Sequence, residues 1–400
     1  MADTSIVLTD VASGVWLDSW SLCGADGPTL AGSGDWSINK RTLRGGLSDG
    51  VDIVEVNNGA FSIQVLPTRG MGLWKADYLG TQLGWNSPVS MPVNPAYVNQ
   101  ESRDGLGWLS GFNELLCRCG LAFNGPPGVD VRVDSDGNSS ETPTTLHGHI
   151  ANTPAHHVEV KIDDDGPGVI SVTGIVDEAS MFGSHLQLKS TLTTAAGSNR
   201  LTITDEITNL SAGAAELELL YHTNFGRPFL EAGARFVAAV RELAPRNQRA
   251  ADGIEDWQTF GPPKTGFEEQ VYFLEPATDE NGNTIAMLHN AAGDLGVSLS
   301  FNVAQLPCFS IWKNTQAEAD GFVTGLEPST DFPNPRTFER EQQRIVTLPA
   351  GGSHVAELQI AVHNTADSVA ETQRAISAIQ GDLAPIVHGK PHARFSPIDD

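Results

Sequence analysis

One glutamate stands in a segment that would hold its carboxylate in a fixed place. Glu327 closes an apolar run and is followed by three prolines within Gly321–Arg336, GFVTGLEPSTDFPNPR. Proline holds φ at about −65° and lacks a backbone donor, so it ends a strand and restricts the loop that follows. A carboxylate at the rigid end of a strand suits a general base, and a solvent-facing glutamate before a proline-rich turn is the competing interpretation.

Two histidine segments upstream supply candidate partners for that carboxylate. His147 and His149 lie in TLHGHI, and His222 lies in LLYHTNFG. Opening a hemiacetal needs one group that removes the hydroxyl proton and another that protonates the ring oxygen. A carboxylate and an imidazole with pKa values on either side of neutrality are therefore the minimal set, and a histidine of either segment would complete it.

The same side chains also permit a metal site. Two histidines in an H-x-H pattern on a strand point to the same face, so His147 and His149 could join His222 and Glu327 around a divalent ion. A metal held there would support keto-sugar isomerisation or β-elimination. A third alternative is a sugar-binding protein without activity, which would not need the histidine–glutamate pair that this chain keeps.

A long segment rich in Trp, Asn, Pro and Gly has the chemistry of a carbohydrate pocket. Leu83–Phe123 reads as irregular, and such segments inside a compact domain are usually functional. Trp108 offers a flat apolar face for sugar C–H groups and Asn113 an amide for hydroxyls, with core packing as the alternative for the aromatic ring. Arg69, in PTRG, would present a planar donor fork to sugar oxygens, unless it pairs with a structural carboxylate.

The elements that position these residues are predicted to be strands. The chain has 400 residues with 41 Gly and 23 Pro, and only 18% of its residues are charged, which favours many short strands over long surface helices. Apolar and polar residues alternate over His185–Thr194 and Leu201–Asn209, as in half-buried antiparallel strands. The NNG sequence at Asn57–Gly59 predicts a hairpin between two further strands. Ala366–Ile379 is the best helix candidate.

We therefore predict a mainly β protein, a large antiparallel sandwich with a few short helices. Residues 1–48 are expected to form an irregular lead-in packed on the main domain. Residues 49–380 are expected to form the sandwich with its sugar-binding and catalytic site. Residues 381–400 form a proline-rich tail that we expect to be mobile.

Charge and cysteine content exclude several classes of partner. The net charge of −25 arises from 49 acidic against 24 basic residues without a basic cluster, a field that repels nucleic acid and anionic lipid. The four cysteines have neither a disulfide framework nor zinc-ribbon spacing, so we expect reduced, buried thiols. No secretory signal or apolar run of about 18 residues is present, which favours a soluble, cytoplasmic protein. Whether it is a monomer or a dimer is left open.

Three short motifs in a fixed order resemble the aldose 1-epimerase (galactose mutarotase-like) superfamily. They are LHG at Leu146–Gly148, YHTNFG at Tyr221–Gly226 and GLEP at Gly325–Pro328. LPTRGMGLW and GFNELL look most like a bacterial branch of that superfamily whose substrate is not defined. The similarity covers Val51 to His363, and its motifs are specific in combination rather than singly.

The resemblance implies an antiparallel β-supersandwich that binds a monosaccharide or sugar derivative and interconverts its anomers without a cofactor. By motif, His147 orients the substrate, His222 protonates the ring oxygen and Glu327 takes the proton of the anomeric hydroxyl. Substrate-binding candidates are Arg69, Trp108, Asn113, His149 and Asn224. One feature departs from the pattern, because the arginine of an N-R-I segment before LHG is missing, and we expect Arg69 to replace it.

Overall fold

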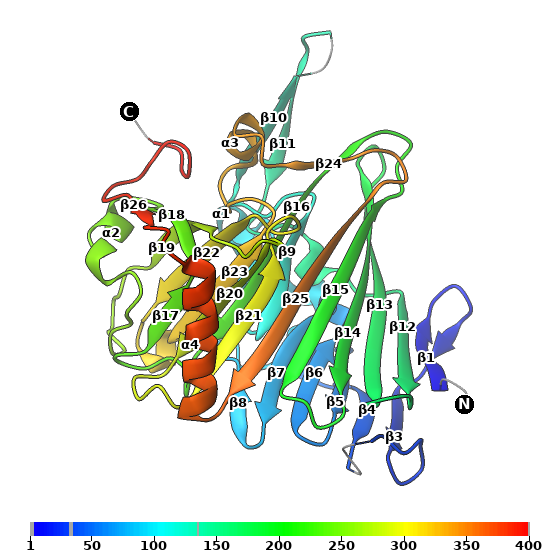
Figure 1. The fold of residues 1–400 in the computed structure, drawn as a ribbon. Coiled ribbons are helices and arrows are strands. Elements are labelled where there is room, and N and C mark those ends of the chain that lie inside the picture. The colour runs from blue at the N-terminus through cyan, green and yellow to red at the C-terminus, as the bar shows by residue number, and fades with distance from the viewer. Residues whose placement is uncertain (1–3, 32–34, 134–135, 399–400) are drawn as a thin grey trace.

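Strand-forming alternation produces two large sheets that stack face to face (Figure 1). The computed structural model describes residues 4–31, 35–133 and 136–398. Within these residues the first sheet has ten strands in the order β17, β20, β21, β25, β15, β14, β13, β12, β1 and β2. The bounds are Arg235–Ala238, Asn283–His289, Gly296–Asn302, Ser353–His363, Arg200–Asn209, His185–Ala195, Val169–Ala179, His157–Asp163, Thr4–Asp10 and Val15–Trp16.

The second sheet carries two of the three predicted catalytic residues, His222 and Glu327, while His147 lies in the turn after β11 (Ser139–Thr144). Its described part has fourteen strands, twelve of them in the order β26, β18, β19, β22, β23, β16, β9, β7, β6, β5, β4 and β3, while β24 pairs with β16 and β8 with β7. The twelve span Ile386–Val387, Val240–Pro245, Gln270–Pro276, Cys308–Asn314, Val323–Ser329, Ala215–Phe225, Leu116–Leu121, Gly72–Tyr78, Phe61–Leu66, Asp52–Asn57, Ser37–Thr42 and Ser19–Cys23; β24 spans Val346–Leu348 and β8 spans Thr81–Leu83.

A hairpin, short helices and 3-10 turns lie outside the two sheets. The β10–β11 hairpin, Gly128–Val133 with Ser139–Thr144, projects away from both sheets (Figure 1). The α-helices are α1 (Ser102–Gly105), α2 (Gln248–Ala251), α3 (Arg336–Glu341) and α4 (Ala366–Gln380). Single 3-10 turns occupy Gly46–Ser48, Pro67–Arg69, Pro95–Tyr97, Gly107–Ser110, Ile150–Asn152, Ile254–Asp256 and Glu318–Asp320. Among the described helices none has the length and hydrophobicity to span a bilayer.

The core lies between the sheets. One continuous apolar cluster joins Val172, Leu188 and Ile203 of the ten-stranded sheet with Val54 and Leu217 of the other. Burying such side chains stabilises the fold by about 25 cal/mol for each Å² of apolar surface removed from water.

An ion pair crosses this core. The guanidinium of Arg118 on β9 binds the carboxylate of Asp205 on β15, and it also donates to Ser190 Oγ at 2.7 Å. The hydroxyl of Tyr221 donates to the same carboxylate at 2.8 Å. Buried charges need such complete pairing, because each loses its hydration. Arg118 therefore ties the two sheets together.

The predicted β class and supersandwich architecture are confirmed by this arrangement. The NNG hairpin forms between β5 and β6, and the predicted helix is α4, which packs on β20 through Val369 and Ile376. Within the described part of residues 1–48, strands β1 and β2 join the ten-stranded sheet and β3 and β4 join the other. In the C-terminal segment β26 pairs with β18, and Phe395 is buried. The four cysteines are free, three of them buried and Cys23 half-buried.

Candidate active site

The catalytic candidates meet at the centre of the fourteen-stranded sheet. Leu220 pairs with Ser329 and Thr223 with Leu326, a register that sets His222 on β16 directly opposite Glu327 on β23. Residues that oppose each other on neighbouring strands lie on the same face. His222 and Glu327 therefore face away from the core between the sheets, toward the long segment that contains Trp108.

The two side chains form a close, buried pair. His222 Nε2 lies 3.2 Å from Glu327 Oε1, and the residues are 5% and 3% exposed. His222 Nδ1 lies 2.7 Å from Asn224 Oδ1. The Asn224 amide nitrogen donates to the carbonyls of Glu114 and His222, so its oxygen is the atom that faces the imidazole. Nδ1 of His222 is then the protonated nitrogen, and the lone pair of Nε2 points at Glu327.

Burial decides where the proton of this pair rests. Loss of hydration raises the pKa of Glu327 to about 8, and the charge of Glu269 adds to the rise. Burial lowers the pKa of His222 to about 3, with His147 as a further cause. At neutral pH the pair therefore holds one proton, on Glu327. That proton also accounts for Glu327 Oε1, which as a carboxylate oxygen would have no hydrogen-bond donor among the described groups.

A glycine makes the close approach possible. Gly325 belongs to the GLEP motif and lies two residues before Glu327 on the same face of β23. A Cβ atom at that position would lie 2.3 Å from Glu327 Oε1 and 3.2 Å from His222 Cε1. Glycine weakens a strand, and here its absent side chain leaves room for the pair.

His147 completes the group of three. Its ring centroid lies 5.5 Å from that of His222. Its backbone has a φ of 60°, a left-handed conformation that non-glycine residues seldom adopt. Nδ1 donates to the carbonyl of Asn124 at 2.8 Å, and burial lowers the pKa of the ring to about 4. Nε2 of His147 is therefore an unprotonated acceptor.

Aromatic side chains wall the site. The Trp108 ring lies 4.8 Å from His147 and 6.2 Å from His222, and Phe112 lies 5.1 Å from His222. Trp312 closes another side at 5.3 Å from His222. The indole nitrogen of Trp108 is buried without an acceptor among the described residues. A buried N–H donor beside two imidazoles is a group that a ligand oxygen can satisfy.

A second charged pair at this site, Glu269 with Arg246, was not predicted from the sequence. Glu269 accepts from Arg246 Nη2 at 2.8 Å and from Trp312 Nε1 at 2.7 Å. Arg246 lowers the pKa of Glu269, although burial opposes this. The charges of Glu269 and Arg246 are among the causes that set the pKa values of His147 and Glu327, after burial. The pairing of β19 with β22, which aligns Val271 with Trp312, brings them there.

Arg69 does not reach the pair. It is 1% exposed and forms an ion pair with Glu114. Its other donors bind the carbonyls of Val93 and Gly111, at 3.0 and 3.1 Å, and Asn152 Oδ1 at 2.8 Å. The guanidinium thus binds the backbone behind the aromatic wall, and the expected contact of Arg69 with a sugar stays a prediction.

Two other candidates also lie outside the pair. His149 is exposed, and its Nδ1 lies 2.8 Å from Gln100 Oε1 beside a hollow of about 880 Å³ near the β10–β11 hairpin. Asn113 is buried and donates to the carbonyl of Val89 at 2.9 Å. Of the predicted substrate-binding residues, Trp108 and Asn224 are therefore the ones that lie against the catalytic group.

The four residues of the metal alternative do not converge, since His149 points elsewhere. In the described part of the chain the group with ligand atoms close enough for an ion is Glu242, His388 and His392. In this group the carboxylate of Glu242 on β18 already binds His388 and Arg394 of the C-terminal segment. Within the described residues, then, the histidine–glutamate pair has no third and fourth ligand.

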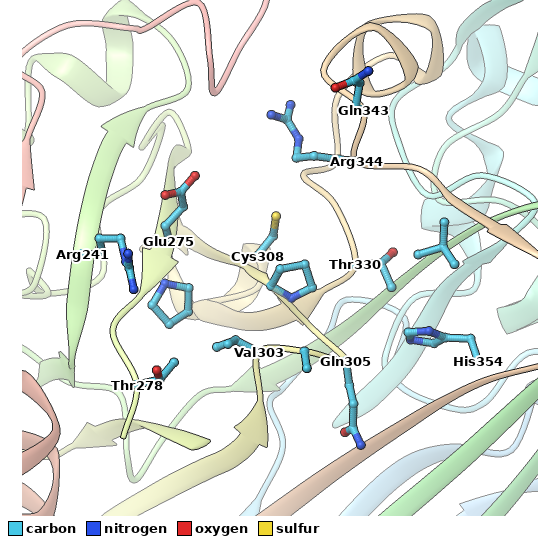
Figure 2. A pocket seen from close by; sticks show the side chains of 14 residues that line it. Arg241, Glu275, Thr278, Val303, Gln305, Cys308, Thr330, Gln343, Arg344 and His354 are labelled. Carbon is cyan, nitrogen blue, oxygen red and sulfur yellow. The ribbon is translucent and has the colours of Figure 1, made fainter. Parts of the chain in front are cut away.

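A separate hollow of about 620 Å³ opens where β22 begins and β23 ends (Figure 2). Figure 2 shows Arg241, Glu275, Arg344 and His354 around it. Neither His222 nor Glu327 lines this hollow. This hollow is therefore separate from the aromatic site that holds the predicted catalytic pair.

An antiparallel supersandwich with these residues at the centre of one sheet defines the class: a galactose mutarotase-like fold. A crystal structure of a proposed aldose 1-epimerase from Klebsiella pneumoniae has 37% sequence identity and a TM-score of 0.89, and the match covers 97% of this chain and 98% of that one. More distant matches are a galactose mutarotase-like protein from Clostridium acetobutylicum (18% identity, TM-score 0.57, 82% and 98% covered) and a proposed aldose 1-epimerase from Escherichia coli K12 (15%, 0.52, 78% and 99%). These two show the fold alone.

The particular family follows from the sequence itself. Residues 48–362 match the domain of unknown function DUF4432, and the chain belongs to that family. Among curated proteins no relative matches. The resemblance to aldose 1-epimerases and mutarotase-like proteins is confirmed by the solved structures.

Proposed function

We propose that this protein is an isomerase that interconverts the α and β anomers of a free sugar. The observation that carries the proposal is the buried His222–Glu327 pair, 3.2 Å apart, which shares one proton at neutral pH. Ring opening of a hemiacetal needs a base that accepts the O1 proton and an acid that donates a proton to the ring oxygen, and a pair with one proton offers both. The aldose 1-epimerase descriptions of similar structures support the same reaction.

In the proposed mechanism, Glu327 removes the proton from O1 while His222 protonates the ring oxygen, and the C1–ring oxygen bond breaks. The resulting open-chain aldehyde rotates about C1–C2 and closes on its other face, which returns both protons. Because the resting proton lies on Glu327, it must first cross to His222. Sugar hydroxyls that donate to the carboxylate favour this transfer, since they replace the hydration that burial removed. His147 Nε2 accepts a hydroxyl and orients the ring.

The charges of the site favour a neutral sugar. His222, Glu327 and His147 are neutral at pH 7, and the charge of Glu269 is offset by Arg246. The three arginines that sequence reasoning singled out, Arg69, Arg118 and Arg227, each pair with a carboxylate elsewhere. An added carboxylate or phosphate would lack a counterion there. We therefore expect neutral aldoses to react faster than uronic acids or sugar phosphates.

The test is the rate at which the α and β anomers interconvert, measured by NMR exchange between their H1 signals. The panel contains neutral aldoses, uronic acids and sugar phosphates. Wild-type protein is expected to accelerate exchange for at least one neutral aldose. Glu327→Gln and His222→Ala should each lower kcat/KM by about 10²-fold or more, the scale of a positioned acid or base. His363→Ala is the matched control, because His363 is buried on the other sheet and binds Ser298.

Two results would count against the proposal. Unchanged exchange in a folded Glu327→Gln protein would remove the carboxylate from the reaction. Sugar binding by the wild type with no exchange of any sugar would favour the non-catalytic alternative.

A further inference from the structure

His147 is held from behind by one buried asparagine. Asn124 is 0% exposed, and its carbonyl accepts the Nδ1–H of His147 at 2.8 Å. Its own N–H donates to Glu218 Oε2 at 2.8 Å, and its amide nitrogen donates to Asp331 Oδ1 at 2.9 Å. Three hydrogen bonds therefore hold Asn124, and one of them comes from His147, a predicted catalytic residue.

Two acceptor atoms next to this contact lack donors. Asn124 Oδ1 and Asp331 Oδ2 are both buried and have no hydrogen-bond partner among the described residues. They are the remaining atoms of two planar groups that already share one hydrogen bond. A single proton on Asp331 Oδ2, donated to Asn124 Oδ1, would give both atoms a partner and close a two-bond ring of carboxylic acid and amide.

We propose that Asp331, as the protonated acid, and Asn124 form a positioning pair that holds His147 with Nδ1 protonated and Nε2 free to accept from the sugar. The role at the sugar rests on the proposed function, whereas the protonation and the tautomer do not. The segment of Asp331 follows directly from β23, so one stretch of chain carries Glu327 and supports His147.

The surroundings favour the protonated acid. Asp331 is completely buried, and Glu218 and Glu339 are the carboxyl groups that face it; all three effects raise its pKa well above the usual value. The hydrogen bonds from Thr330 and Asn124 oppose the rise and are smaller causes. Burial also raises the pKa of Glu218, to about 7, but Arg336 binds Glu218 and Arg344 binds Glu339, whereas among the described residues no arginine pairs with Asp331. Asp331 is thus the acid that keeps its proton.

Two spectroscopic measurements test the pair without any substrate. In wild type we expect ¹⁵N NMR to find the His147 ring with hydrogen on Nδ1. We expect infrared difference spectra of wild type minus Asp331→Asn at neutral pH to show the carbonyl band of a protonated carboxylic acid. A carboxylate band alone would overturn the protonation, and a ring with hydrogen on Nε2 would overturn the positioning.

Variants give the functional arm of the test. Asp331→Asn keeps a donor toward Asn124 and should hold kcat/KM for the reacting sugar within about twofold. Asp331→Ala leaves the amide without its partner and should raise KM about tenfold, the loss of one buried hydrogen bond, while the His147 ring becomes a mixture of tautomers. Asn209→Ala is the control, since Asn209 is equally buried but binds Leu348 and Gly213.

The outcomes separate this inference from the proposed function. If wild type exchanges no sugar, the proposed function fails, yet the tautomer and the infrared band still decide the pair. If Asp331→Ala does not fold, wild type and Asp331→Asn suffice. An unchanged His147 tautomer in folded Asp331→Ala protein would overturn the positioning role.

Discussion

Strands β14 and β16 have eleven residues each, yet they are buried in opposite ways. On β14 every second residue is buried and the residues between them are half-buried or exposed. On β16 all residues from Leu217 to Phe225 are buried. One sheet thus has a wet outer face, whereas the centre of the other is covered on both faces.

The cover over β16 is the segment with Trp85, Trp108 and Phe112, which packs on Leu220 and Val323. It turns a sheet face that would otherwise meet water into a dry site. The ionisable groups placed there lose their hydration, which raises the pKa of Glu327 and lowers that of His222. A strand that loses its alternation and still keeps ionisable residues, as β16 does, is therefore a place to look for a functional site.

The rate should depend steeply on pH if the covered face sets these pKa values. Above the pKa of Glu327, about 8, the pair loses its only proton, so kcat/KM should fall about tenfold for each further pH unit. No fall is expected near the ordinary pKa of histidine, because that of His222 is about 3. Anomer exchange between pH 5 and 10, corrected for the enzyme-free rate, measures this. A change of kcat/KM near pH 6.5, with no fall above pH 8, would contradict this expectation.

A methyl group should break the covered face where an open face would accept it. Gly325→Ala places Cβ 2.3 Å from Glu327 Oε1, so the pair must separate. We expect a loss of about tenfold in kcat and about 1–3 kcal/mol in stability from overpacking. Gly213→Ala is the control, since a Cβ there meets nothing within 4 Å. Equal kinetics in both variants would show that the pair does not need this contact.

The buried carboxyl should also mark stability. The pKa of Glu327 is about 8 in the folded protein and 4.5 as its ordinary value, so the folded state binds more protons between these limits. Its contribution to stability is therefore complete below pH 4.5 and is lost as pH rises through 8. Glu327→Gln should stabilise the protein by about 3 kcal/mol at pH 7 and by less than about 1 kcal/mol at pH 5.

Thermal melts at both pH values measure this effect. Glu206→Gln on β15 is the matched control, because Glu206 is exposed on the ten-stranded sheet. The same gain in the control, or none in Glu327→Gln, would argue against a buried neutral carboxyl.

Much of the fold could be predicted from local patterns. Alternation located β14 and β15, the NNG turn located β5 and β6, and amphipathic spacing located α4. The order of strands could not be predicted, because β16 pairs with β9 and β23, each about a hundred residues away in sequence. Periodicity within a strand carries no information about such distant partners.

The residues of the site likewise differ in whether local sequence or distant strand pairing reveals them. Proline stiffening singled out Glu327, and the structure sets it opposite His222. Glu269 was missed because it follows Glu268, an identical residue with no distinguishing signal. The Glu268 side chain is 81% exposed and pairs with Arg249, whereas that of Glu269 is 46% exposed and accepts from Trp312 Nε1. Which of two neighbours faces the site depends on strand pairing, which a one-residue shift would invert.

Arg69 is buried behind the covered face, and its hydrogen-bond partners do not include His222 or Glu327. Arg69→Lys should lower stability by about 2 kcal/mol, because one ammonium cannot serve the four acceptors that the guanidinium binds. The KM for the reacting sugar should stay within about twofold of wild type, since no direct contact is lost. Arg227→Lys is the control, an exposed arginine paired with Glu318 that should change neither quantity. Melting curves and exchange kinetics on the same preparations separate the two effects. A large rise in KM with an unchanged melting midpoint would place the Arg69 guanidinium at the sugar after all, and the segment behind Trp108 would then move when a ligand binds.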